Sequence, residues 1–304
     1  MDKLVECVPN FSEGRRPEVV KQILEVIRGV AGVKLLDYSS DPSHNRTVVT
    51  FVGAPEQVKT AAFLAAKKAS ELIDMEQHRG EHPRIGATDV IPLIPISGLT
   101  MDDCVRLARE LGQEIGEKLQ IPVYLYEEAA LRPERRSLPR VRQGEYEGLK
   151  ETIGRPERRP DFGPARLHPT AGATAVGARP PLIAYNINLG TDDVAVAKAI
   201  AKAIRGSSGG YPSIKALGVM LEDRNIAQVT INVCNYREVP LYRVLETVKS
   251  EAARYGVNVI GSEIVGLVPM EALLDAAAYY LRLEGFSQDQ VLEKRIHEGN
   301  ERKR

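Results

Sequence analysis

The sequence contains no tryptophan, only three cysteines and no excess of either charge. Cys7, Cys104 and Cys234 are odd in number and far apart, which argues against a disulfide framework and against a thiolate zinc site. With 41 basic and 41 acidic side chains, the chain has no global charge to attract nucleic acid or an anionic membrane. We therefore expect neither nucleic acid nor a membrane among its partners.

Long apolar runs are also missing. No run approaches the roughly 18 residues that a membrane-spanning helix needs. The N-terminal stretch MDKLVECVPNFSEG lacks the apolar segment of a signal peptide, so we expect a cytoplasmic protein. Hydrophobic residues make up 43% of the 304 positions, and a chain of this length suggests about two domains.

The apolar periodicity predicts the same order of elements twice. In the first half we expect strand, helix, strand, strand, helix, strand, and the second half repeats that order. This pattern predicts an α+β fold of two ferredoxin-like βαββαβ units, each a mainly antiparallel sheet with helices on one face. We place the subdomains at residues 1–180 and 181–304. The strands are expected at residues 4–9, 33–36, 47–52, 90–96, 123–126, 182–189, 216–221, 228–233 and 257–260.

Several residues mark where the helices start. Pro17, Pro55 and Pro240 suit the first turn of a helix, and Thr100 with Asp103 resembles a capping box. Further helices are expected from about Thr191 and over residues 270–281.

Prolines make two further segments distinctive. Pro92 and Pro95 remove hydrogen-bond donors from the strand at 90–96, which predicts that it lies at a sheet edge. Residues 132–181 contain eight prolines and many arginines, and no regular pattern. Such a segment is either a linker or a functional wall that lets a flat ligand approach the backbone closely.

The stretch HRGEHPRIGATDVIPLIPI, residues 78–96, carries the most chemistry. His78 to His82 fits H-x-x-E-H, a zinc-peptidase pattern that requires both histidines on one helix. Gly80 weakens a helix and Pro83 disfavours helical backbone at His82, so we expect no metal. A loop imidazole at His82 suits general acid and base catalysis near neutral pH. A surface histidine fixed by Pro83 is the alternative.

Five blocks of sequence resemble the glutamate formiminotransferase family, in the same order along nearly the whole chain. They are LVECVPNFSEG, DPSHNRTVVTFVG, IDMEQHRGEHPRIGATDVIPLIPI, DFGPARLHPTAGATAVGAR and GLVPMEALLDAAAYYL. The resemblance implies two related subdomains with a folate-binding cleft between them, and a homodimer. It implies transfer of a formimino group from N-formimino-L-glutamate to N5 of tetrahydrofolate. Animal members of the family often carry a fused cyclodeaminase domain, for which this chain ends too early, so transferase activity alone is expected.

The resemblance also assigns residues. His82 corresponds to the catalytic histidine of the family. The folate-binding stretch corresponds to Gly163, Pro164, Ala165, Arg166, Leu167, His168, Pro169, Thr170, Ala171 and Gly172. Tetrahydrofolate is then the acceptor substrate, and no metal is required. The chain departs from the animal D-x-D-x-G-P-S pattern, because Ser39 stands at the middle acidic position, and Asp41 is the residue that can replace it.

The substrates call for further charged groups. Asp41 or Glu81 can stabilise the cationic formimino group. Arginine grips a carboxylate through two hydrogen bonds, so Arg46, Arg84 and Arg179 are candidates to bind the glutamate part of the donor. Each of these arginines can instead be a structural ion-pair member.

Three rival functions remain to be weighed. A related folate enzyme can act on 5-formyltetrahydrofolate, because a formyl carbon closely resembles a formimino carbon in shape. A folate-binding protein without catalysis is the second rival. The third is an RNA-binding module, which the neutral charge and the lack of an aromatic RNA-binding strand disfavour.

Overall fold

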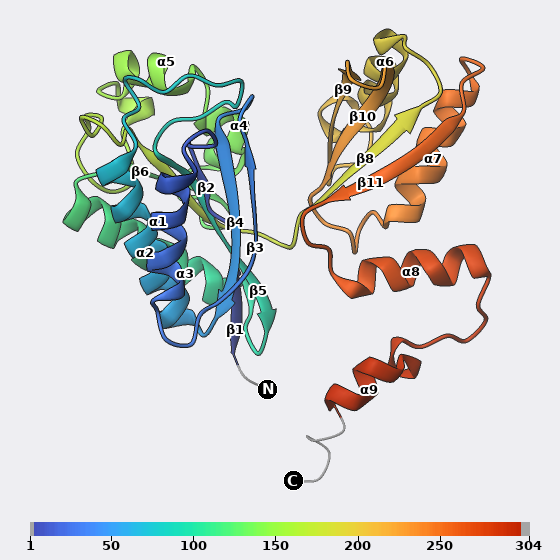
Figure 1. Cartoon of the computed structure of the whole chain (residues 1–304), viewed down its shortest axis with the longest axis horizontal. Coiled ribbons are helices and arrows are strands. Elements are labelled where there is room, and N and C mark those ends of the chain that lie inside the picture. Colours follow the sequence, from blue (N-terminus) through green and yellow to red (C-terminus); the bar gives the residue numbers. More distant parts are fainter. Residues whose placement is uncertain (1–2, 299–304) are drawn as a thin grey trace. The chain divides into compact units, whose positions relative to one another are not determined.

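The computed structural model describes residues 3–298 of the chain. The chain divides into two compact units, Met1–Pro180 and Pro181–Arg304 (Figure 1). We call them unit 1 and unit 2 and describe each by itself.

Unit 1 is built around a βαββαβ core. Its four strands are β1 (Leu4–Cys7), β3 (Lys34–Asp41), β4 (Arg46–Gly53) and β5 (Thr88–Ser97). β1 lies between β4 and β5, β3 pairs with the other side of β4, and all these pairings are antiparallel. The short strand β2 (Asn10–Phe11) continues β1 between the same neighbours. The predicted α+β fold class is confirmed.

Three helices cover one face of this sheet (Figure 1). They are α1 (Pro17–Arg28), α2 (Pro55–Leu72) and α3 (Met101–Glu114). α1 and α2 start with the predicted prolines, whose fixed φ suits a first helical turn. Thr100 and Asp103 form the predicted capping box at α3. The buried apolar residues recur every three to four positions, so each helix buries one face against the strands.

β5 is an internal strand, so its predicted position at a sheet edge is wrong. β1 and β2 pair with one side of it, and β7 (Thr174–Ala178) pairs in parallel with the other. Pro92 lies opposite the break between β1 and β2, where the N–H of Val8 donates to its carbonyl at 3.3 Å. Pro95 lies beyond Leu93, the last residue of β5 that pairs with β7. The missing donors therefore fall where no ladder partner needs them.

All of residues 132–181 except Pro181 belong to unit 1, so the linker interpretation is wrong. They contain two short helices, α4 (Leu138–Val141) and α5 (Glu145–Thr152), and the strand β7. β6 (Val123–Glu127) pairs in parallel with β7 and completes the sheet. Apolar side chains of α4 and α5 pack with those of β6 and β7 in a second core, which excludes water from this part of the unit.

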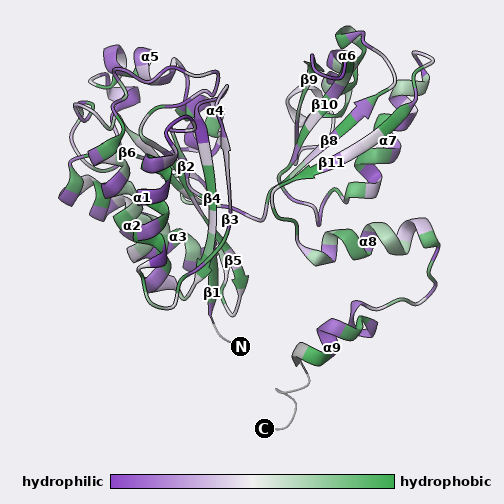
Figure 2. Cartoon of the chain, in the orientation of Figure 1, coloured by the Kyte–Doolittle hydropathy of each residue, from purple (hydrophilic) through white to green (hydrophobic). Residues whose placement is uncertain are grey.

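Unit 2 repeats the βαββαβ order with one antiparallel sheet, β11–β8–β10–β9. α6 and α7 supply the helical side of its core. α8 consists mostly of hydrophobic residues (Figure 2), although only Ala272 in it is buried. The elements are β8 (Ile183–Leu189), α6 (Val194–Ile204), β9 (Ile214–Leu221), β10 (Ile226–Val233), α7 (Leu241–Ala253), β11 (Val259–Val265), α8 (Met270–Leu281) and α9 (Leu292–Glu298).

The corresponding hairpins of the two units turn in the same way. Asn45 ends the turn between β3 and β4 with φ of 48°, and Asn225 ends the turn between β9 and β10 with φ of 49°. Asparagine tolerates this left-handed conformation better than most residues, because its short side chain can bond locally. The next residue, Arg46 or Ile226, is the first of the following strand.

We predict that Gly86→Ala strongly destabilises unit 1. A Cβ at this position would lie 1.9 Å from the carbonyl oxygen of Ala173 and 2.5 Å from that of Ala171, so backbone would have to move. We expect a loss of about 3 kcal/mol or more in the free energy of unfolding, measured by denaturant titration. Gly148→Ala is the matched control, because its Cβ meets nothing within 4 Å inside α5. It should stabilise by about 0.5–1 kcal/mol, and equal effects of the two changes would contradict this prediction.

Candidate active site around His82

His82 lies in an irregular loop between α2 and β5, as Gly80 and Pro83 predict. The H-x-x-E-H pattern is therefore not on a helix, and the geometry of a zinc peptidase is missing. Both ring nitrogens of His78 have protein partners: Nε2 lies 3.0 Å from the carbonyl of Asn45, and Nδ1 lies 3.3 Å from Nε of Arg84. Among the side chains of residues 3–296, no three of His, Cys, Asp or Glu are grouped to hold a metal ion.

The imidazole of His82 is buried between charges of opposite sign. It is 7% exposed. Nε2 lies 3.5 Å from Oδ2 of Asp89, and Nδ1 lies 3.4 Å from Nη1 of Arg46. Burial lowers the pKa of His82; Asp89 opposes this effect, while Arg46 and Arg142 add to it. The ring is therefore neutral at neutral pH, the form that accepts a proton.

Asp89 is a buried carboxylate with several partners. It is 1% exposed, near the start of β5. Oδ1 accepts the N–H of Ile85 at 2.9 Å, and Oδ2 accepts a hydrogen bond from Nη2 of Arg142. Burial raises the pKa of Asp89, but Arg142, His82 and the Ile85 N–H outweigh burial and hold the pKa below its usual value. Asp89 is therefore ionised.

Arg142 is a site residue that the sequence did not single out. It follows α4, 53 positions after Asp89. In the sequence it is one of many arginines in residues 132–181, and no spacing distinguishes it. Only the packing of that segment against β5 reveals its role.

Arg46 is the unpaired cation of the site. It is the first residue of β4, and its Nε is buried without a hydrogen-bond partner in the described part of the chain. No ion pair within 4.0 Å joins it to a side-chain carboxylate of residues 3–296. Burial lowers its pKa, as does the nearby Arg142, while Asp41 and Asp89 oppose them. A partly buried guanidinium without a carboxylate partner is suited to bind an anionic ligand.

The other two candidate arginines are already engaged. Arg84 is buried and donates to carboxylate oxygens of Glu145 and Glu147 at 2.7–2.9 Å. Arg179 donates to the carbonyl of Pro180, and its backbone N–H bonds to Leu93. Leu93 lies four residues beyond Asp89 along β5, so the backbone of Arg179 joins the strand roughly 13 Å from the backbone of Asp89.

The two candidate carboxylates differ in availability. Asp41 lies directly across the hairpin from Arg46. It accepts the backbone N–H of His44 at 2.9 Å and lies 2.8 Å from the His44 ring. Burial raises the pKa of Asp41, but these bonds to His44 outweigh it and lower the pKa. Glu81 is exposed, and its backbone N–H bonds to Ser43 at 3.2 Å, which ties the His82 loop to the same hairpin.

The segment 163–172 reaches the loop that carries His82. Gly86 and Gly172 form a bridge, and the N–H of Ala87 donates to the carbonyl of Ala171 at 2.9 Å. His168 closes the segment on itself, because its Nδ1 accepts the backbone N–H of Ala171 at 3.0 Å. Gly172 has φ of 70°, and a Cβ there would lie 2.5 Å from the carbonyl of Ile85. Glycine is thus required where the two segments meet.

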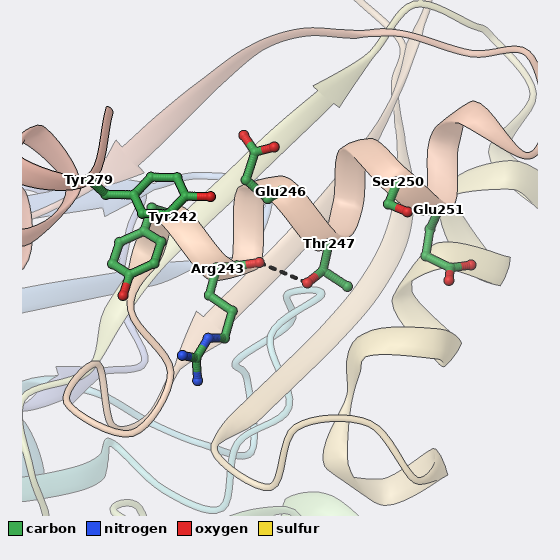
Figure 3. Close-up of a pocket in the computed structure, with 7 residues that line it drawn as sticks. All are labelled: Tyr242, Arg243, Glu246, Thr247, Ser250, Glu251 and Tyr279. Carbon is green, nitrogen blue, oxygen red and sulfur yellow. Dashed lines mark hydrogen bonds between the residues drawn. The ribbon is translucent and has the colours of Figure 1, made fainter. Parts of the chain in front are cut away.

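Two surface hollows lie elsewhere. One of about 500 Å³ on unit 2 is lined by α7 residues and by Tyr279, whose ring stacks on Tyr242 at 4.2 Å (Figure 3). A smaller one of about 170 Å³ on unit 1 adjoins the first turns of α2 and α3. Neither hollow is lined by a candidate site residue of the sequence analysis, so the candidate site is defined by its side chains.

Comparisons with known proteins identify relatives along nearly the whole chain. Residues 4–179 match the family model described as the formiminotransferase domain, N-terminal subdomain, and residues 184–298 match the formiminotransferase domain. Glutamate formimidoyltransferase of Streptococcus pyogenes serotype M1 is 52% identical over 97% of this chain and 99% of its own length. The Thermoplasma acidophilum protein of the same name is 52% identical over 96% and 97%. Formimidoyltransferase-cyclodeaminase of Rattus norvegicus is 49% identical over 92% of this chain and 53% of its own length.

We predict that the protein loses stability as the pH falls below about 6.5, the usual histidine pKa. Burial lowers the pKa of His78 and of His82 in the folded protein. Below about pH 6.5 the unfolded chain therefore binds more protons than the folded chain, and the free energy of unfolding decreases as the pH falls. Denaturant midpoints between about pH 5 and 8 would measure this. His78→Gln should flatten the dependence, and a midpoint that stays constant or rises toward acid would contradict the prediction.

Proposed function

The chain belongs to the formiminotransferase family, and on that premise we propose that it transfers a formimino group from N-formimino-L-glutamate to N5 of tetrahydrofolate. The products are 5-formiminotetrahydrofolate and L-glutamate. The observation that carries the proposal is the neutral, buried His82 held between Asp89 and Arg46, in a loop bonded to segment 163–172.

His82 is the catalytic residue of this reaction. N5 of the folate attacks the formimino carbon and forms a tetrahedral carbon bonded to three nitrogens. The neutral imidazole takes the proton from N5 and passes it to the nitrogen of glutamate. The bond between that nitrogen and the formimino carbon then breaks, and glutamate leaves. One such proton-transfer group is worth on the order of 10² to 10⁴ in rate, and its lowered pKa keeps the receptive form available.

Arg46 binds a carboxylate of the donor. Its guanidinium lies 3.4 Å from the His82 ring and lacks a carboxylate partner among the described residues, whereas Arg84 and Arg179 are held by protein groups. A carboxylate on Arg46 would place the formimino group of the same molecule near the imidazole. Glu81 is the more available carboxylate to face the cationic formimino group, because Asp41 is bonded to His44.

Segment 163–172 binds the folate. Gly163, Ala165, Arg166 and Pro169 are exposed, so this stretch presents a surface of small residues and backbone to a flat ring. Its far end is fixed to the His82 loop through Gly172. That connection supports a single site in which both substrates are held close together.

The protein acts in the cytoplasm as a homodimer. The family resemblance supports the homodimer. Cys7, Cys104 and Cys234 form no disulfide, which suits a reducing compartment. In residues 3–298 no helix has both the length and the apolar character needed to cross a bilayer.

His82→Ala should lower glutamate release by about 10² to 10⁴, because the proton-transfer group is gone. The assay measures glutamate released from N-formimino-L-glutamate with and without tetrahydrofolate, in metal-free buffer. Folate binding, followed separately, should persist. His44→Ala is the control, since that ring bonds to Asp41 within the hairpin turn and not to His82 or Arg46. If the wild-type protein binds tetrahydrofolate but releases no glutamate, the donor is wrong and 5-formyltetrahydrofolate is tested next.

Arg46→Gln should raise the KM for N-formimino-L-glutamate roughly ten- to a hundredfold, the usual worth of a charged hydrogen bond. The KM for tetrahydrofolate should change little. Arg15→Gln is the matched control, because Arg15 bonds to the carbonyl of Pro42 at the surface. A fall in kcat with an unchanged donor KM would show instead that Arg46 serves His82 and not the donor.

A further inference from the structure

We propose that Asp89 is a positioning residue that holds His82 in the Nε2–H tautomer, so that Nδ1 is the nitrogen that takes and returns the proton. This inference deepens the proposed function and rests on it. It assigns a direction to the imidazole, which the sequence leaves open because either ring nitrogen can carry the proton.

The first line of argument comes from the Nε2 side of the ring. Nε2 is buried, faces Oδ2 of Asp89 at 3.5 Å, and has no other polar partner in the part of the chain whose side chains are described, residues 3–296. A lone pair on Nε2 would point at an ionised carboxylate and be repelled by it. An N–H at Nε2 is attracted instead, and a shift of a few tenths of an ångström brings it into the ordinary range of about 2.7–3.2 Å.

The second line comes independently from the Nδ1 side. Nδ1 faces Nη1 of Arg46 at 3.4 Å. A guanidinium has donors only, so it tolerates a lone pair on Nδ1 and opposes an N–H there. Both neighbours therefore select the same tautomer. Nδ1 also lies beside the unpaired cation that we assign to the donor carboxylate, so the reactive nitrogen and the donor meet on one side of the ring.

Because of Arg142, Asp89 can orient the imidazole of His82 without raising its pKa so far that the ring stays protonated. An isolated buried carboxylate would raise the pKa of a neighbouring imidazole and keep it protonated. Here Arg142 bonds to the same Oδ2 of Asp89, and its positive charge opposes a second charge on the ring. The charged groups that face His82 are Asp89, Arg46 and Arg142, with a net charge of +1. His82 can accordingly give its proton back to the leaving nitrogen.

Asp89 can orient the His82 ring because its own side chain is fixed by hydrogen bonds and burial. Oδ1 of Asp89 is bonded to the N–H of Ile85, three residues after His82, and the side chain is nearly inaccessible to water. The carboxylate thus connects the first residues of strand β5, the His82 loop and Arg142. A group so constrained can hold a partner ring to a narrow orientation.

The direct test is nitrogen NMR of the full wild-type chain labelled with ¹⁵N-histidine, without substrates. The chain has only five histidines, and His82→Gln identifies the signals of this ring. We expect a protonated Nε2 and an unprotonated Nδ1 near neutral pH. The opposite tautomer, or an equal mixture, would overturn the proposal. Because no substrate is involved, this result is separate from success or failure of the proposed reaction.

Two variants with opposite predicted signs complete the test. In the wild-type protein the Asp89 carboxylate accepts a hydrogen bond from the Nε2–H of His82. Asp89→Asn replaces it with an amide, whose NH₂ group can instead donate to an unprotonated Nε2. The tautomer preference should be lost, and kcat should fall on the order of 10² to 10⁴-fold with substrate KM values kept. Loss of the negative charge also lowers the pKa of His82 further, so the acid limb of the kcat/KM profile moves to lower pH.

Arg142→Gln removes a positive charge and keeps Asp89. The pKa of His82 should then rise, so the acid limb moves to higher pH while the tautomer stays the same. Limbs that move in the same direction in the two variants, or do not move, would contradict the proposal. If Asp89→Asn does not fold, the wild-type spectrum and the Arg142→Gln profile still decide the question.

Discussion

The buried ion pair of Asp89 and Arg142 is the interaction on which the arrangement around His82 depends. A carboxylate that is 1% exposed is costly to bury unless charge and hydrogen bonds compensate it. Arg142 and the N–H of Ile85 provide that compensation. Because Arg142 comes from segment 132–181 and Ile85 from the His82 loop, satisfying one charge fixes both segments against β5. The orientation of the imidazole is then a consequence of how a charge is buried.

The two units show how chemistry is added to a repeated fold. Both have the βαββαβ order and a hairpin whose turn ends at an asparagine with positive φ. The first residue after that turn is Arg46 in unit 1 and Ile226 in unit 2. The same backbone therefore carries a cation in one unit and an apolar side chain in the other. The elements near His82 that have no counterpart in the described part of unit 2 are β6, β7 and the segment between them, which includes α4 and α5.

Local signals in the sequence were reliable where a single element decides the outcome. Proline starts α1 and α2, and the capping box starts α3, because those preferences act within one turn of helix. Two expectations failed for a common reason. β5 is internal despite its prolines, and β7 is a strand although its sequence, TAVGA, is short and rich in small residues. Whether a segment forms a strand, and whether that strand is internal, depends on which other segments pair with it. The periodicity of one segment does not show which segments those are.

The sequence by itself determined the family, the repeated fold class and a loop conformation at His82, because Gly80 and Pro83 restrict the backbone locally. The tertiary structure alone decided which charges face that histidine. Arg46 and Arg142 are 36 and 60 positions away from His82, whereas Arg84, only two positions away, is taken up by Glu145 and Glu147. Coulombic attraction depends on distance in space and on burial, and neither can be read from separation along the chain.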